Sequence, residues 1–287
     1  MQAQFSQELL SSFYLWFENA LVADSVKAYN TNQSNSFEYV DFKDVPSSHH
    51  GYQGRFRQLV TDQDVDIPNS GFFIDGNFVT GAENGIYIDY SDGRIIVPSA
   101  SGSGLTITAN NTVKEVNTYF SEEDPEQLII TNDFIDSAAT DTTHLFSKEA
   151  KRDEKTYILP ACFIRYVSTN GEPISFGGED NSKTRIQVVV LAYTNYVLDG
   201  IMGAFSDLER TCIAEVPYGD FPYGRFNDIK AYPYSYSTLS DSYASKTWVE
   251  NITTSKVTNS MTQDNMQKNL LVGFLDFDLS TFRYPRV

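Results

Sequence analysis

The chain has 287 residues, and 21 Lys and Arg against 38 Asp and Glu give it a formal net charge of −17. Such acidity argues against sequence-independent binding to nucleic acid, because that affinity comes from Lys and Arg neutralising phosphates. The length allows one large domain or two small ones. No apolar run approaches the roughly 18 residues of a membrane span, so we expect a soluble protein.

The N-terminal segment predicts an amphipathic helix over residues 5–29. Its apolar side chains recur at spacings of three and four, and no Gly or Pro interrupts them. Residues 30–36 and 44–54 are polar and predict loops. Short extended segments are expected at 37–42 and 55–59. No basic residue precedes Lys27 and no small-residue cleavage site follows an apolar run, so we expect no secretory signal.

Residues 61–124 predict an inserted antiparallel β module. Short β-rich runs between 70 and 120 alternate with Gly and Asn. The Ser-Asp-Gly turn at 91–93 lies between the apolar runs 86–88 and 95–97, which is a strong hairpin signal. The apolar run that follows the module, at 128–130, predicts a strand.

The stretch from 157 to 213 predicts a strand, a polar loop, a second strand and a helix. The segments 157–167 and 185–193 are apolar and rich in β-formers, whereas 168–183 is too polar for a core. Residues 195–212 carry apolar side chains at helical spacing.

The last third of the chain predicts a long loop and two strands. The loop, 216–245, is rich in Pro and Tyr, and loops of this length within a compact domain are usually functional or ordered by a partner. The strands are expected at 246–257 and 270–282. The whole pattern predicts an α+β fold with a mostly antiparallel sheet flanked by an N-terminal and a central helix. Its core is formed by 1–60 and 125–287.

The cysteines and histidines predict no redox or metal chemistry. Cys162 falls in a predicted strand and Cys212 on the apolar face of the predicted helix, so both are expected as buried, reduced thiols. His49 and His50 are adjacent, which places them on opposite faces of an extended chain and makes them poor ligands for one metal. We therefore expect no metal and no cofactor.

The carboxylates raise the possibility of glycoside hydrolysis. Asp276 and Asp278 share one face of a predicted strand, and a second acidic cluster lies at 122–126. Nothing in the sequence indicates that either group is desolvated, and exposed charge pairs on strands are common. No nucleophile, base and orienting partner occur together, so we expect no enzyme.

Three segments resemble parts of the head–tail junction proteins of tailed phages, namely neck, stopper and tail-terminator proteins. The N-terminal helix, YILPACFIRY (157–166) and TRIQVVVLAYTNYVLDGIMGAFSDLERTCI (184–213) are similar to the α/β core of tail-terminator rings. The hairpin GIYIDYSDGRIIVP (85–98) is similar to β modules of large-phage virion proteins. The resemblance spans about half of the chain, and the inserted module departs from it, so neck and terminator both stay open.

This resemblance implies a virion structural subunit that assembles in the host cytoplasm. Such proteins form rings, commonly hexamers, between neighbouring neck, adaptor or tail-tube proteins, and DNA passes as cargo through the lumen, here an acidic one. No membrane is involved. Arg forms bidentate bonds with carboxylates and Tyr suits interfaces. The candidate contacts between copies are Arg165, Arg185, Arg210, Glu179, Asp180, Tyr218, Tyr223 and Arg225.

The alternative is a β-rich tail-fibre or surface module that binds or cleaves carbohydrate. The tyrosines at 217–236 could stack on sugars, and the β module could be lectin-like. Against this alternative, the N-terminal helix and the strand–helix core are unusual in lectins, and no repeat indicates a fibre.

Overall fold

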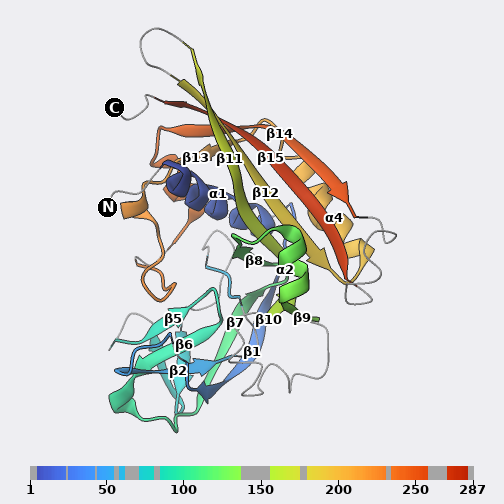
Figure 1. Cartoon of the computed structure of the whole chain (residues 1–287). Coiled ribbons are helices and arrows are strands. Elements are labelled where there is room, and N and C mark those ends of the chain that lie inside the picture. Colours follow the sequence, from blue (N-terminus) through green and yellow to red (C-terminus); the bar gives the residue numbers. More distant parts are fainter. Residues whose placement is uncertain are drawn as a thin grey trace.

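Two mostly antiparallel β-sheets lie at opposite ends of the molecule (Figure 1). The computed structural model describes residues 5–23, 25–42, 44–54, 58–61, 71–80, 85–136, 156–174, 180–230, 234–257 and 270–283. No helix in these ranges is both long and apolar enough to cross a membrane. The α+β fold predicted from the sequence is confirmed.

The first sheet has six strands and follows the predicted core. In spatial order they are β13 (Cys212–Ala214), β14 (Lys246–Lys256), β15 (Leu271–Arg283), β12 (Asp180–Ala192), β11 (Ala161–Pro173) and β8 (Asn117–Phe120). All neighbouring strands in it are antiparallel except β8 and β11. The two C-terminal strands predicted from the sequence are confirmed as β14 and β15.

Two helices, α1 (Phe5–Val22) and α4 (Asn195–Ser206), pack on one face of this sheet. Aromatic rings dominate the contact: Phe17 stacks on Phe205 at 4.1 Å between centroids, and Phe277 of β15 meets Phe13 edge-on at 4.9 Å. Thr194 caps α4 by accepting a hydrogen bond from the backbone of Val197. The predicted apolar faces of both helices therefore form the largest core.

The N-terminal helix is shorter than the predicted 5–29. It ends at Val22, and the chain reverses at Lys27, whose φ of 53° is left-handed. The backbone N–H of Ala28 donates to the carbonyl of Leu21, which closes this reversal. Residues from Tyr29 onward enter a strand instead.

Among the described residues, those that cover the opposite face of the six-stranded sheet lie at one end of it. There α2 (Pro125–Thr131) and the parallel pair β9 (Asp133–Asp136) and β10 (Thr156–Leu159) form a second apolar cluster with Phe163 and Val189. The strand predicted at 128–130 is wrong, because these residues belong to α2. Pro125 occupies the first turn of α2, where its missing N–H costs nothing.

The second sheet has seven strands. Their order is β4 (Asn77–Thr80), β3 (Gly71–Ile74), β7 (Ile107–Lys114), β1 (Tyr29–Val40), β2 (His49–Gln53), β6 (Arg94–Pro98) and β5 (Tyr87–Asp89). The predicted hairpin is confirmed as β5 and β6, with Asp89 opposite Arg94. The short 3₁₀ turn η1 (Ser99–Ser101) follows β6.

This sheet does not coincide with the predicted module at 61–124. Its strands come from 29–114, whereas β8 joins the six-stranded sheet. The loops predicted at 30–36 and over much of 44–54 are wrong, since they contribute to β1 and β2. The first half of β1 is rich in Asn and Ser rather than in apolar residues, because most of its side chains are exposed.

The loop predicted at 168–183 is wrong in the same way. β11 continues to Pro173 and β12 begins at Asp180, so residues 168–173 and 180–183 form the far end of a long antiparallel hairpin, while 175–179 lie outside the described residues. The side chains of residues 168–172 are mostly exposed, and the pairing of backbone groups between two strands does not require apolar side chains. The polar side chains of these parts of β11 and β12 therefore gave no local signal of a strand.

The prediction that Cys212 belongs to the central helix and is buried is wrong. α4 ends at Ser206, and Cys212 starts β13, where it is exposed, whereas Cys162 is buried in β11 as predicted. Both are free thiols.

The region predicted as one loop, 216–245, contains short helices. These are the 3₁₀ turn η2 (Tyr218–Asp220) and α5 (Tyr236–Asp241), which Ser235 caps through the N–H of Thr238. Its start is fixed to α1, because the hydroxyl of Ser12 accepts a 2.9 Å hydrogen bond from the N–H of Val216.

Candidate functional site

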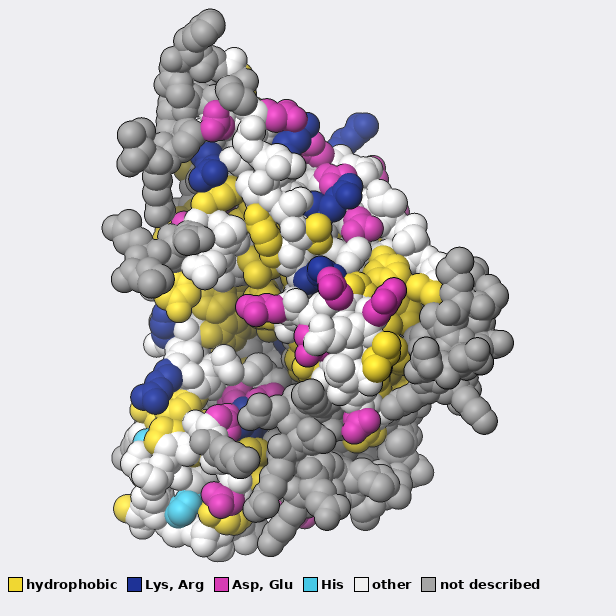
Figure 2. Space-filling view, viewed as in Figure 1, with side chains coloured by type: hydrophobic (Ala, Val, Ile, Leu, Met, Phe, Trp, Pro, Cys, Tyr) yellow, Lys and Arg dark blue, Asp and Glu magenta, His cyan; other side chains and the backbone are white. Residues whose placement is uncertain are grey.

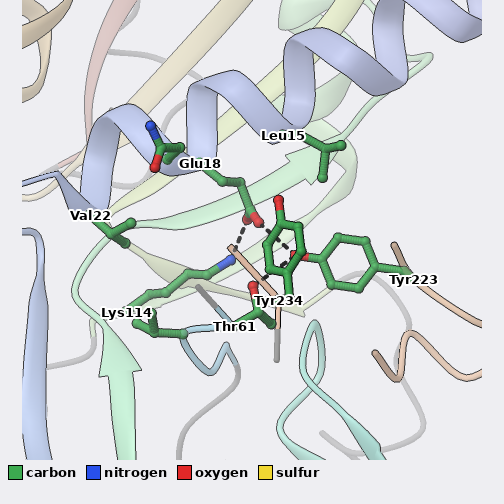
Figure 3. Close-up of a pocket in the computed structure, with 9 residues that line it drawn as sticks. Leu15, Glu18, Val22, Thr61, Lys114, Tyr223 and Tyr234 are labelled. Atoms are coloured by element: carbon green, nitrogen blue, oxygen red, sulfur yellow. Dashed lines mark hydrogen bonds and ion pairs between the residues drawn. The ribbon is translucent and has the colours of Figure 1, made fainter. Parts of the chain in front are cut away.

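A buried ion pair joins the two sheets. Glu18 of α1 bonds to Lys114 at the end of β7, and their side chains are 8% and 6% exposed (Figure 3). A charge buried without its partner is costly, so this pair ties the helix of one sheet to a strand of the other.

Gln58 reinforces this junction. Its amide nitrogen donates to the carbonyl of Thr118 at 2.7 Å, and its amide oxygen accepts from the N–H of Thr118 at 2.8 Å. The same oxygen lies 3.4 Å from the Lys114 ammonium, and the Lys114 N–H donates to the Gln58 carbonyl at 3.0 Å. Gln58 thus connects β7 of one sheet with β8 of the other.

Tyr223, one of the predicted contacts between copies, reaches into this junction. Figure 3 shows its hydroxyl between Glu18 and Thr61, at 3.4 and 2.9 Å. Its ring packs against Tyr234, with centroids 6.2 Å apart. These contacts fix the segment 221–230 to α1.

The same segment is also fixed to the seven-stranded sheet. The side-chain amide of Asn227 donates to the hydroxyl of Ser91 in the β5–β6 turn at 2.8 Å, and the ring of Phe226 lies 5.0 Å from that of Tyr87. The tyrosine-rich segment is therefore a bridge within one chain.

An acidic cluster around one arginine stabilises the β5–β6 turn. The Arg94 guanidinium bonds to Asp89 at 3.1 Å, to Asp44 at 2.8 Å and to Asp92. One oxygen of Asp89 also accepts from the backbone N–H groups of Ser91 and Asp92, both at 3.1 Å. Burial, followed by the nearby charge of Asp92, raises the pKa of Asp89.

Between the sheets lies a cleft of about 260 Å³, which we call the inter-sheet cleft. α1, β8, the β5–β6 turn and the 221–230 bridge line it, and Figure 2 shows hydrophobic side chains gathered in this hollow. Tyr14 packs on Phe120 there, with ring centroids 4.7 Å apart, while Phe120 stays 48% exposed. Asp92 and Asn227 add polar groups to its wall.

Tyr14 makes the junction sensitive to alkaline pH. Burial first, and the carboxylate of Glu18 second, raise the pKa of Tyr14 well above its ordinary value of 10.0. A group whose pKa is raised by folding contributes stability that is complete below its unfolded pKa and is lost as pH rises through the folded one.

We therefore expect the free energy of unfolding to fall as pH rises from about 9 to about 11, and Tyr14→Phe to reduce that fall. Urea melts at the two pH values measure it. The control is Tyr196→Phe, because Tyr196 is 89% exposed and should leave the slope unchanged. Equal slopes in wild type and Tyr14→Phe would contradict the assignment.

The predicted contact residues Arg165 and Arg185 have partners in their own chain. Arg165 bonds to Asp124 at 2.8 Å, and Arg185 bonds to Asp278, its cross-strand neighbour, at 3.0 Å. Exposed pairs of this kind contribute about 1 kcal/mol or less, so a neighbouring carboxylate could replace either partner.

The other predicted contact residues are scattered. Tyr218 is 63% exposed, Arg225 lies over the ring of Phe226 at 5.6 Å, and Asp180 begins β12 opposite Pro173. Arg210 is exposed in a turn, with a left-handed φ of 64°. Glu179 lies outside the described residues. Those within the described residues do not form one cluster.

The carboxylates of Asp276 and Asp278, which were considered for catalysis, form hydrogen bonds across the sheet. Asp276 accepts a 2.9 Å hydrogen bond from Gln187, as Asp278 does from Arg185, so each bonds to its partner on β12. His49 shares a 2.9 Å hydrogen bond with Ser48, and the ring of His50 lies 5.4 Å from that of Tyr39. Within the described ranges, no group of three or more His, Cys, Asp or Glu could hold a metal ion.

Sequence reasoning missed the buried ion pair. A signal for Glu18 exists, since Leu15, Glu18 and Val22 follow the helical spacing of three and four that defines a buried face. Lys114 ends a polar strand and offers no such signal. No protein-family model matches the sequence, and comparison with curated proteins finds no significant match.

Proposed function

We propose that the chain is a structural subunit of a ring at the head–tail junction of a tailed phage, of the neck or tail-terminator type. The observation that carries this proposal is the far end of the β11–β12 hairpin, residues 167–174 and 180–183, which we call the arm and which lies at one end of the six-stranded sheet (Figure 1). Apolar side chains are exposed on it, with Val167 at 42% and Ile174 at 50%.

Within the described residues, β15 pairs with β12 as far as Asp180, opposite Arg283, but no strand pairs with the outer side of β11 along the arm. A strand edge of this kind presents backbone N–H and C=O groups that have no partner strand, so pairing with another chain is a natural source of further stability. The exposed Arg185–Asp278 pair at its base is weak enough to exchange partners with a neighbouring copy. The net charge of −17 supports a lumen through which DNA slides without adhering.

A variant with a shortened arm tests this proposal. Replacing residues 168–183 by a two-residue Asn-Gly turn should leave the six-stranded core folded, as circular dichroism would report. Light scattering should then give multiples of the 32.3 kDa chain mass for the wild type but the single-chain mass for the variant. Equal assembly of both chains contradicts a role for the arm.

Carbohydrate binding is the second candidate, and the inter-sheet cleft is the observation that favours it. Tyr14, Phe120 and Tyr223 offer aromatic rings there, and Asp92 and Asn227 offer hydrogen-bonding groups. This combination suits sugars, which stack on rings and bond through hydroxyls. A chain that stays monomeric and binds a glycan, with binding lost in Phe120→Ala, would replace the ring proposal.

A further inference from the structure

The two outermost strands of the six-stranded sheet cover only part of their neighbours. β8 pairs with β11 at Ala161–Ile164, and β13 pairs with β14 at Lys246–Trp248. Beyond these positions, no strand within the described ranges pairs with the outer side of either long strand. We call residues 165–173 the β11 edge and residues 250–256 the β14 edge.

Both edges carry backbone groups that point away from their own sheet. The N–H of Val257 donates to the carbonyl of Val272, so Val257 faces β15. Because antiparallel strands alternate in this respect, the N–H and carbonyl of Thr254 face outward. The positions that would meet another strand are Tyr166–Asn170 on the β11 edge and Thr253–Ser255 on the β14 edge. Seven of these eight side chains are exposed, so they leave the approach open. Such edges are templates for another strand.

The directions of the two edges are complementary. β11, β12, β15 and β14 are antiparallel in turn, so β11 and β14 run in opposite directions. A second copy in the same orientation would therefore place its β11 edge antiparallel to the β14 edge of the first.

The alternation of faces also fixes a register. Thr169 and Thr254 lie opposite Thr184 and Leu275, two buried residues of the helix-covered face. Pairing Thr169 with Thr254 keeps that face continuous between copies. It also places Asn170 opposite Thr253.

This register implies a stagger that suits a closed assembly. Through β12, Thr169 lies at the level of Leu279, whereas Thr254 lies at the level of Leu275, four residues away along β15. Four residues of stagger across four strands correspond to a tilt of roughly 35°, from the usual strand rise and spacing. Closed β-barrels have tilts of about 35–45°.

We propose that the β11 edge of one copy pairs with the β14 edge of the next, so that the six-stranded sheet continues from copy to copy. The contact joins two different surfaces, and such heterologous contacts form rings when the rotation between copies closes. The inference rests on the proposed ring and adds to it the surfaces that join the copies.

Thr254→Pro tests the edge directly. Proline removes the outward N–H and is tolerated on an edge strand, so the protomer should fold while assembly is lost. The matched control, Thr254→Val, keeps the N–H and should assemble as the wild type does. Light scattering at equal concentration reports assembly, and circular dichroism reports folding.

A cross-link decides the register whether or not the proline variant folds. Asn170→Cys with Thr253→Cys, in a Cys212→Ser background, should give a ladder of disulfide-linked multiples on oxidation, and either cysteine alone should not. A wild-type chain that remains monomeric overturns both the ring and the edge pairing. Rings that survive Thr254→Pro and give no ladder overturn the edge pairing alone.

Discussion

Lys114→Met should destabilise the protein by about 3–5 kcal/mol, because it leaves the Glu18 carboxylate buried without its counter-ion. Both side chains are less than a tenth exposed, so water cannot replace the lost ammonium. Tyr223 also points its hydroxyl at Glu18, and we expect the 221–230 bridge to loosen with it. Urea melts followed by circular dichroism measure the change.

The same substitution at an exposed pair is the control. Lys256 pairs with Asp199, but the two side chains are 44% and 54% exposed, so Lys256→Met should cost about 1 kcal/mol or less. The double variant Glu18→Gln with Lys114→Met should recover much of the loss, because no charge then stays buried alone. Equal costs for Lys114→Met and Lys256→Met would show that the junction is open to water.

Phe205→Asp should abolish soluble folding. Phe205 is 1% exposed, stacked on Phe17 with 5° between the rings and 6.0 Å from the ring of Phe277. A carboxylate at this position has no partner among these rings, and its burial costs several kcal/mol. The milder Phe205→Ala should cost about 3–5 kcal/mol.

Tyr196→Asp provides the comparison within the same helix. Tyr196 is 89% exposed near the start of α4, where a carboxylate also suits the helix dipole. We expect a soluble protein with wild-type melting. If Phe205→Asp melts as the wild type does, the helix–sheet core is not the centre of stability.

The sequence predicts those parts of the fold in which the local structure itself imposes the side-chain pattern. The apolar stripe of α1, the Asp-Gly turn before β6 and the alternating residues of β15 each match what the structure contains. Each is a local signal that burial or turn geometry imposes.

The errors arise where tertiary pairing overrides local signals. Residues 168–173 and 180–183 are polar yet form strands, because each strand supplies the other's backbone partners. Leu128 and Ile129 lie in a helix because a preceding proline starts one and the cluster around Phe163 accepts its buried face. The intrinsic helix or strand propensity of a short sequence window carries no information about partners that lie far away in the sequence.

The candidate site is the least predictable part for the same reason. Arg165 and Arg185 are predicted as contacts between copies, but the chain itself supplies a carboxylate for each: Asp124 before α2 for Arg165, and the cross-strand Asp278 for Arg185. Lys114 meets Glu18 and Gln58 only after the two sheets have formed and come together.

Electron microscopy of the purified full-length chain in negative stain tests the ring most directly. The account predicts closed rings of uniform diameter with a central opening, formed by this chain alone at micromolar concentration. Isolated single-chain particles, in fields where light scattering also gives the mass of one chain, would contradict it.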